Sequence, residues 1–367
     1  MRHSTKQIFV GDVAIGGDAP ISIQSMTNTK TEDVDTTVKQ ILQLVDVGCE
    51  IIRVAVPNND AVDALPHIIN QSPIPVIADI HFDYKLALGA INAGAHAVRI
   101  NPGNIGSIDK VQAVAKLANE KNIPIRVGAN SGSLPKEWAQ KVLECDKRDS
   151  LAHDKILAEG LVASVFEQIK ILESCDFLNI KVSLKASSVR ATFLAYQLFA
   201  EQSDYPLHIG VTEAGTLERG IIKSSVGIGA LLLNGIGDTL RVSLTADPVE
   251  EIKVAKTILE SCGLREPICE VVSCPTCGRT NIDLEGLANK VEAIIAEKFS
   301  NGSKQLNVKK VAVMGCVVNG PGEARDADLG IAGGDNKVAV FRDGEVVGIY
   351  SENEGLQVLA DFITELF

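Results

Sequence analysis

The chain has 367 residues, of which 46% are hydrophobic and only 4% aromatic, and its formal net charge is −12. This length is enough for two domains with a large aliphatic core, and 31 glycines among many valines, isoleucines and alanines are typical of an α/β protein. An acidic surface repels nucleic acid and anionic membranes, which excludes both as general partners. Any anionic ligand must therefore bind to a local cluster of basic residues.

The sequence contains no targeting or membrane segment that we recognise. Its first residues, MRHSTKQIFVGD, lack an apolar signal core, and no stretch is long and apolar enough to span a bilayer. We therefore expect a cytoplasmic location. In that compartment the eight cysteines are expected to be free thiols or ligands rather than disulfides.

Taken in chain order, residues 7–17 predict a β-hairpin, and short apolar runs then alternate with segments of helical periodicity. Residues 33–48 and 107–122 are examples of the predicted amphipathic helices. The apolar runs predict eight strands, at residues 21–26, 50–56, 74–80, 96–102, 123–130, 176–185, 206–214 and 238–244.

Eight strands that are each followed by a helix predict a (β/α)₈ TIM barrel, which needs about 250 residues. An open, doubly wound sheet is the alternative, but the chain lacks a glycine-rich dinucleotide turn after the first strand. Residues 132–149 are irregular and predict a loop with a short helix over the barrel mouth, the end formed by the carboxyl ends of the strands. Trp138 in this loop is expected to be a packing anchor.

A second, α+β part begins near Glu266. It predicts strands at residues 269–274, 308–315, 330–334, 337–344 and 345–350, and helices at 284–299 and 356–366. The sequence RDGE predicts the turn of a hairpin. The expected domains are therefore a substrate-binding barrel, residues 1–265, and a small α+β domain, residues 266–367.

Cations recur near the carboxyl ends of the predicted barrel strands, where barrel enzymes place their chemistry. The basic residues concerned are Arg53, Arg99, Arg126, Lys181, Lys185 and Arg241. Packed cations repel one another unless an anion lies between them, and arginine matches phosphate oxygens, so a phosphate or diphosphate ligand is predicted. The alternatives are that each cation pairs with a carboxylate, that Lys181 or Lys185 forms a Schiff base, or that Asp79 and His81 bind a divalent ion.

Polar residues that could handle a proton lie at the same strand ends. Asp79 and His81 end the third strand, Asn101 follows Arg99, Asn130 ends the fifth strand and Glu213 ends the seventh. A carboxylate among arginines stays ionised, so Asp79 or Glu213 could position a hydroxyl or relay a proton. Each carboxylate could instead be only a structural partner of an arginine.

Three cysteines and a glutamate in the last quarter of the chain have the pattern of iron–sulfur ligands. Cys274 and Cys277 lie in SCPTCGRT, and Cys316 and Glu323 lie in MGCVVNGPGE. A two-residue gap lets two thiolates reach one metal or cluster from a single turn. A zinc site with Cys269 as fourth ligand stays open, although this part has only one close cysteine pair and no histidine. A thioredoxin-like use of CPTC would leave Cys316 unexplained.

The motifs ADIHFD, RINPGN, HIGVTEAG, GIGDTLRVSLT, CPTCGRT and MGCVVNGPGE occur in this order. In that combination the chain closely resembles the hydroxymethylbutenyl diphosphate synthase family of the methylerythritol phosphate route to isoprenoids. The resemblance runs nearly end to end and fits the two-domain bacterial form, without the inserted domain of plant forms.

The resemblance implies an oxidoreductase that reductively opens 2-C-methyl-D-erythritol 2,4-cyclodiphosphate and expels water, using electrons delivered through a [4Fe–4S] cluster. The implied cluster ligands are Cys274, Cys277, Cys316 and Glu323. In a barrel like that of dihydropteroate synthase, the implied substrate-binding residues are Arg53, Arg99, Asn101, Arg126, Asn130, Lys185, Arg241, Ser243 and His81. Glu213 is the implied catalytic carboxylate, with Asp79 as its helper.

The resemblance also implies partners. Reduced flavodoxin is the implied electron donor, or ferredoxin in some members. The implied assembly is a head-to-tail homodimer, in which the cluster of one subunit covers the barrel of the other.

Overall fold

The computed structural model describes residues 2–105, 107–146, 148–267, 269–300, 308–316, 326–334 and 337–365. The chain divides into two compact units, Met1–Arg265 and Glu266–Phe367. No helix in the described part of the chain combines the length and the apolar character needed to cross a membrane.

The first unit is built on eight parallel strands, one at each run that the sequence predicts. Their bounds are β3 Ser22–Met26, β4 Ile51–Ala55, β5 Val76–Asp79, β6 Ala97–Arg99, β7 Ile125–Asn130, β8 Ile180–Lys185, β9 His208–Ile209 and β10 Thr239–Leu240. The sheet order is β8-β7-β6-β5-β4-β3-β10-β9. A further parallel bridge between Val182 and Leu207 joins β8 to the start of β9, so the sheet curls into the predicted barrel.

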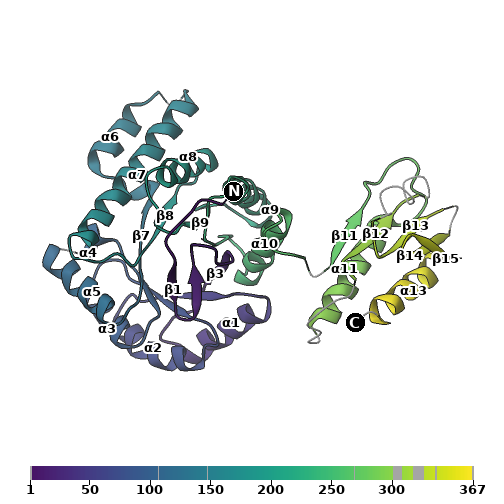
Figure 1. The fold of residues 1–367 in the computed structure, drawn as a ribbon, viewed down its shortest axis with the longest axis horizontal. Coiled ribbons are helices and arrows are strands. Elements are labelled where there is room, and N and C mark those ends of the chain that lie inside the picture. Colours follow the sequence, from purple (N-terminus) through teal and green to yellow (C-terminus); the bar gives the residue numbers. More distant parts are fainter. Residues whose placement is uncertain are drawn as a thin grey trace. The chain divides into compact units, whose positions relative to one another are not determined.

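Helices form a ring around these strands (Figure 1). Their bounds are α1 Val34–Asp46, α2 Asn59–Gln71, α3 Tyr84–Asn92, α4 Pro102–Ile105, α5 Ile108–Glu120, α7 Ser150–Glu173, α8 Val189–Ala200, α9 Leu217–Leu233 and α10 Pro248–Ser261. Several of them begin where the sequence offers a capping side chain: Asp33, Asn58, Asp83, Asp149, Ser188 and Asp247 each accept a hydrogen bond from the first turn. These caps help to explain why the helices start so close to the strand ends.

The irregular segment after β7 contains a 3₁₀ turn, Ser131–Ser133, and α6, Lys136–Glu144, as predicted. Trp138 packs against α7, because a Cβ atom on Gly160 would lie only 3.0 Å from the Cβ atom of Trp138. The Lys141 ammonium lies 4.2 Å from the centre of the indole ring. Trp138 is therefore the expected packing anchor.

Strand alternation divides the barrel into an apolar outer layer and a largely polar interior. Residues that point outward, such as Ile52, Val54 and Val98, pack against the helices in the main core. The predicted hairpin, β1 Ile8–Val10 and β2 Val13–Ile15, closes the opposite end from the mouth. Its apolar residues pack on the first inward residues of β4, β5 and β6.

The second unit has a mixed five-stranded sheet in the order β11-β12-β13-β14-β15. Its elements are β11 Glu270–Ser273, α11 Leu284–Ser300, β12 Lys310–Met314, β13 Leu329–Gly333, β14 Val338–Arg342, β15 Glu345–Tyr350 and α13 Glu352–Glu365. The first three strands are parallel, and β14 and β15 are antiparallel to their neighbours. Apolar residues of α11 and α13 share one core with the sheet. Asp343 and Gly344 make the predicted hairpin turn, both with left-handed backbone (φ 50° and 82°).

Candidate active site and cysteine cluster

Asp79, the last residue of β5, lies among arginines in the mouth of the barrel. Its carboxylate is 3.5 Å from Nε of Arg53 and 3.3 Å from Nη1 of Arg99, and only 5% of the side chain is exposed. Burial alone would raise the pKa of Asp79, but the charges of Arg53, Arg99 and Arg126 outweigh it and lower that pKa. Asp79 is therefore ionised, as the sequence suggests, and it is also a structural partner of two arginines.

His81 lies at the rim beside this group. Nη1 of Arg99 is 3.1 Å from Nδ1 of His81, and Nε2 of His81 is 3.7 Å from Asp79. Burial lowers the pKa of His81, and the neighbouring arginines lower it further, so the ring is neutral at neutral pH. A neutral imidazole here can accept a hydrogen bond from Arg99 without adding another positive charge.

Arg241 has a separate carboxylate partner that sequence reasoning missed. Nη2 of Arg241 is 3.4 Å from Oε2 of Glu251, a buried residue of α10. Oε1 of Glu251 accepts a hydrogen bond of 2.9 Å from the backbone N–H of Leu244. The sequence did contain a signal for this partner, because Glu251 is a charged residue on the otherwise apolar face of a helix. The Sδ atom of Met26 accepts weak hydrogen bonds from both Arg53 and Arg241 and so lies between the two arginine groups.

Arg126 and Lys181 lie deeper in the barrel than the strand-end pattern suggests. They are register partners on β7 and β8, and their side chains are 3% and 0% exposed. The prediction that Lys181 reaches the mouth with the other cations is therefore corrected: it begins the inward face of β8, and Lys185 ends it. Nε of Arg126 and Nζ of Lys181 have no hydrogen-bond partner within the described residues.

Cation crowding is the dominant electrostatic feature of the mouth. We call Arg53, Arg99, Arg126, Lys185 and Arg241 the strand-end cations; Arg126 is included, although it lies deeper, because its charge acts on Asp79 together with those of Arg53 and Arg99. In the part of the chain that the structure describes, two buried carboxylates, Asp79 and Glu251, form ion pairs with them. Burial and the neighbouring positive charges lower the pKa of Arg53 to about 10 and lower the pKa values of Arg126 and Lys185 well below their usual range. Five cations with two carboxylate partners leave an excess of positive charge in this group, so a bound anion would stabilise it.

The remaining predicted residues lie around this group. Asn130 is exposed at the end of β7, and Asn101 and Ser243 are half-buried just beyond β6 and β10. Glu213 follows β9 and is exposed, with φ of +52°. A residue other than glycine rarely adopts this left-handed backbone, and such positions concentrate at functional sites. The left-handed backbone is a property of Glu213 that the sequence did not predict.

In the second unit, two of the predicted cluster ligands lie at the carboxyl ends of neighbouring strands. Cys274 directly follows β11 and Cys316 lies two residues after β12, and these strands are parallel neighbours. The backbone N–H of Gly315 donates a hydrogen bond of 3.1 Å to Sγ of Cys274. A Cβ atom on Gly315 would collide with Thr280. Glycine is therefore needed where this strand end approaches the loop that contains Cys277.

Cys277 is exposed, and hydrogen bonds from the backbone and the side chain of Arg279 lower the pKa of its thiol. The Arg279 charge also interacts with Cys316. Cys274 therefore lies beside the strand end that leads to Cys316, and Arg279 interacts with both Cys277 and Cys316. Glu323 lies outside the described residues. Among the described ones, no group of three or more histidine, cysteine or acidic residues could hold a single metal ion.

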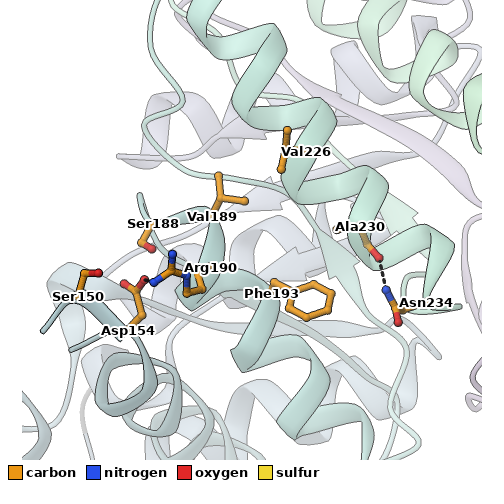
Figure 2. A pocket seen from close by; sticks show the side chains of 9 residues that line it. All are labelled: Ser150, Asp154, Ser188, Val189, Arg190, Phe193, Val226, Ala230 and Asn234. Carbon is orange, nitrogen blue, oxygen red and sulfur yellow. Dashed lines mark hydrogen bonds and ion pairs between the residues drawn. The ribbon is translucent and has the colours of Figure 1, made fainter. Parts of the chain in front are cut away.

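A groove of about 520 Å³ lies elsewhere, on the outer helical layer of the barrel. Figure 2 shows it between α7, α8 and α9, with Asp154 and Arg190 at one end and Asn234 at the other. Its lining is mainly apolar and includes none of the strand-end cations. The candidate active site is therefore defined by its charged groups and not by this groove.

The fold and the site define a class: a (β/α)₈ barrel with a cationic mouth, followed by a small domain whose cysteines meet at parallel strand ends. Two family models match the chain, the GcpE TIM-barrel domain over residues 5–256 and the GcpE protein C-terminal domain over residues 270–365. The chain therefore belongs to the GcpE family.

Curated relatives support this assignment along the whole chain. A protein of Clostridium perfringens (strain 13 / Type A) is 52% identical over 99% of both chains. One of Maridesulfovibrio salexigens is 53% identical and covers 100% of this chain and 96% of its own. Both relatives are named 4-hydroxy-3-methylbut-2-en-1-yl diphosphate synthase (flavodoxin).

Two solved structures each cover 71% of this chain. The dihydropteroate synthase of Yersinia pestis has a TM-score of 0.44 and 14% identity, and covers 71% of this chain and 100% of its own. The 3-dehydroquinate dehydratase of Geobacillus kaustophilus HTA426 has a TM-score of 0.49 and 15% identity, with 71% and 99% covered. The barrel assignment depends on the strand topology and the family model instead.

Proposed function

We propose that this chain is the oxidoreductase that forms 4-hydroxy-3-methylbut-2-en-1-yl diphosphate by reductive ring opening and dehydration of 2-C-methyl-D-erythritol 2,4-cyclodiphosphate. Its relatives have the name of this enzyme. The observation that carries the proposal is the excess of positive charge in the barrel mouth, five strand-end cations against two ion-paired carboxylates, because a cyclic diphosphate supplies the missing negative charge.

In this proposal the strand-end cations bind the diphosphate. Arg53 and Arg99 are held in place by Asp79, and Arg241 is held by Glu251, so their guanidinium groups are oriented before substrate arrives. Pre-orientation reduces the entropy lost when substrate is fixed for reaction. Polar contacts to the rest of the substrate come from the rim: His81, Asn101, Asn130 and Ser243.

Two carboxylates are proposed to act on protons. Glu213 is the proposed catalytic carboxylate, since it is exposed at the mouth and lies on a strained backbone position. Asp79 is fully engaged with Arg53 and Arg99, which suits a helper that orients cations and stays ionised. The two roles are assigned by exposure, because the side chain of Glu213 is exposed and that of Asp79 is buried.

Cys274, Cys277, Cys316 and Glu323 are proposed to hold a [4Fe–4S] cluster. Two observations on the described residues support this ligand set: the Cys274 sulfur accepts a backbone N–H, and the pKa of Cys277 is lowered, which favours the thiolate that iron requires. When bound, the cluster supplies single electrons to the substrate. The carboxylate of Glu323 is a weaker ligand than thiolate, which would leave one iron accessible.

Reduced flavodoxin is the proposed electron donor, in keeping with the names of the relatives, with ferredoxin as the alternative. A head-to-tail homodimer is proposed as the working assembly, with the second unit of one subunit serving the barrel of the other. Analytical ultracentrifugation of the full chain tests the dimer directly.

Anaerobic purification followed by iron, sulfide and zinc counts tests the core of the proposal. We expect a brown protein with roughly four irons per chain. Turnover of the cyclodiphosphate with reduced flavodoxin should follow. A colourless protein with stoichiometric zinc, and no cluster after anaerobic reconstitution, would contradict it and favour a non-redox enzyme acting on a sugar phosphate.

A further inference from the structure

Below the strand-end cations, the barrel interior contains polar side chains that neither solvent nor other described residues satisfy. Lys181 on β8 and His208 on β9 are both 0% exposed. Neither Nζ of Lys181 nor either ring nitrogen of His208 has a hydrogen-bond partner among the residues described. The same is true of the polar side-chain atoms of Ser22, Gln24 and Thr239. Buried polar atoms are normally satisfied by ordered water or a ligand, so this interior is expected to be hydrated.

The strand register links this interior to the mouth. Lys181, Ser183 and Lys185 share the inward face of β8. The bridge between Val182 and Leu207 brings His208 beside Ser183, between Lys181 and Lys185. Lys185 lies over the next inward position of the neighbouring strand, because a Cβ atom on Gly210 would be 3.1 Å from its Nζ. A continuous line of polar groups therefore runs from Lys181 up to the strand-end cations.

The charged groups that face Lys181 and His208 are nearly all positive. Arg53 and Arg126 act on both, Lys185 acts on His208, and the carboxylate that acts on Lys181 is Asp238. That carboxylate already has an ion pair of 2.8 Å with Arg2 and accepts the backbone N–H of Leu207 at 2.7 Å. Burial first, and these positive charges second, lower the pKa values of Lys181 and His208 well below their usual range. Burial without a hydrogen-bond partner and the nearby positive charges therefore disfavour the protonated forms of both groups when no anion is bound.

We infer that Lys181 and His208 form a buried proton-accepting pair, which takes up a proton when an anionic ligand binds to the strand-end cations. The inference rests on the proposed function for the location of the anion. The negative charge of the ligand offsets Arg53 and Arg126, two of the charges that oppose protonation of Lys181 and His208. Since the coupling is reciprocal, ligand binding favours protonation, and protonation favours ligand binding.

The proposed reaction consumes one proton. The ring C–O bond breaks and leaves its electron pair on the phosphate oxygen, the adjacent C–OH bond breaks, and a C=C bond forms. Two electrons from the reduced donor and one proton balance the step, with the proton leaving on the hydroxyl as water. A proton gathered on binding lies below the substrate, and the polar line through His208 and Lys185 leads toward it.

Calorimetric titration of the cluster-loaded protein with inorganic diphosphate tests the inference. Titrations in two buffers of different ionisation enthalpy give the number of protons taken up per ligand bound. The ligand can itself change protonation, so the decisive quantity is the difference between wild type and Lys181→Met. We expect wild type to take up about one proton more than Lys181→Met between pH 7 and 8. His208→Gln should reduce the uptake, and Thr239→Val, which removes a buried hydroxyl that does not titrate, should leave it unchanged.

The outcomes are distinguishable. Equal uptake by wild type and Lys181→Met, with diphosphate bound by both, overturns the buried pair and leaves the proposed function standing. Failure of wild type to bind diphosphate counts against the anion site of the proposed function and overturns the inference with it. If Lys181→Met does not fold, the difference between wild type and His208→Gln is measured instead, and equal proton uptake by these two proteins overturns the inference.

Discussion

Asp79 is expected to be the residue on which the stability of the barrel mouth depends most strongly, and Asp79→Asn tests this. The substitution keeps the shape of the side chain but removes the charge that faces Arg53 at 3.5 Å and Arg99 at 3.3 Å. Removing one partner of a buried ion pair leaves uncompensated charge and typically costs 3–5 kcal/mol, so we expect a loss of about 3 kcal/mol. For a unit of this size, that loss corresponds to a fall in Tm of roughly 6–12 °C.

The assay can be restricted to the barrel. Trp138 is the only tryptophan in the chain, and it packs on α7 within the first unit. Urea unfolding of the full chain, followed by tryptophan fluorescence, therefore reports the barrel and not the second unit. Asp83→Asn is the matched control: it is the same substitution at an exposed helix cap, where asparagine caps equally well, and it should leave stability unchanged.

The pH dependence gives a second check. The pKa of Asp79 is lowered in the folded protein, so its contribution is fully present above the unfolded carboxyl pKa of about 3.9 and is lost as the pH falls through the folded value. The difference in stability between wild type and Asp79→Asn should therefore disappear in acid. Inorganic diphosphate should stabilise Asp79→Asn more than wild type, because the variant has more uncompensated positive charge. The account would be refuted if the free energy of unfolding of Asp79→Asn at neutral pH lay within about 0.5 kcal/mol of the wild-type value, since breaking a buried ion pair is expected to cost roughly 3 kcal/mol.

Three further substitutions test the proposed roles. Cys316→Ser should abolish iron retention and turnover, with iron retention measured by iron counts and absorbance. Cys262→Ser, at the end of a barrel helix, is the control and should retain both. A fully active Cys316→Ser protein would exclude Cys316 as a ligand. Arg99→Ala should weaken diphosphate binding by roughly 10- to 100-fold in calorimetry with the cluster spectrum intact, and an unchanged affinity would remove Arg99 from the binding site. Glu213→Gln should lower turnover by about 10²- to 10⁴-fold with little change in Tm, because the side chain is exposed; unimpaired turnover would exclude it as the catalytic carboxylate.

The sequence alone predicted the barrel because its signals are local. Each apolar run had the length of a strand, and the segments between the runs had helical periodicity. The period-two alternation of strands also determines which residues share a face, for example Lys181, Ser183 and Lys185. Local patterns of this kind need no knowledge of which strands are neighbours.

Depth and partnership were decided only by the tertiary structure. Alternation tells which face of a strand a residue occupies, but its height in a barrel depends on the stagger between neighbouring strands, which no single strand encodes. This is why Lys181 was wrongly expected at the mouth. Glu251 was missed because its partner, Arg241, lies on a different element, and the pairing exists only once α10 packs on the barrel.

The cysteines divide in the same way. Their spacing within SCPTCGRT and MGCVVNGPGE was readable from the sequence and indicated a metal or cluster site. Cys274 and Cys316 lie at the same end of the sheet because β11 and β12 are parallel neighbours. Hydrogen bonds across the sheet establish this pairing between segments about 40 residues apart. The sequence determined the kinds of chemical group and the face each one occupies. Strand stagger and strand order, which are properties of the assembled sheet, determined how deep those groups lie and which of them meet.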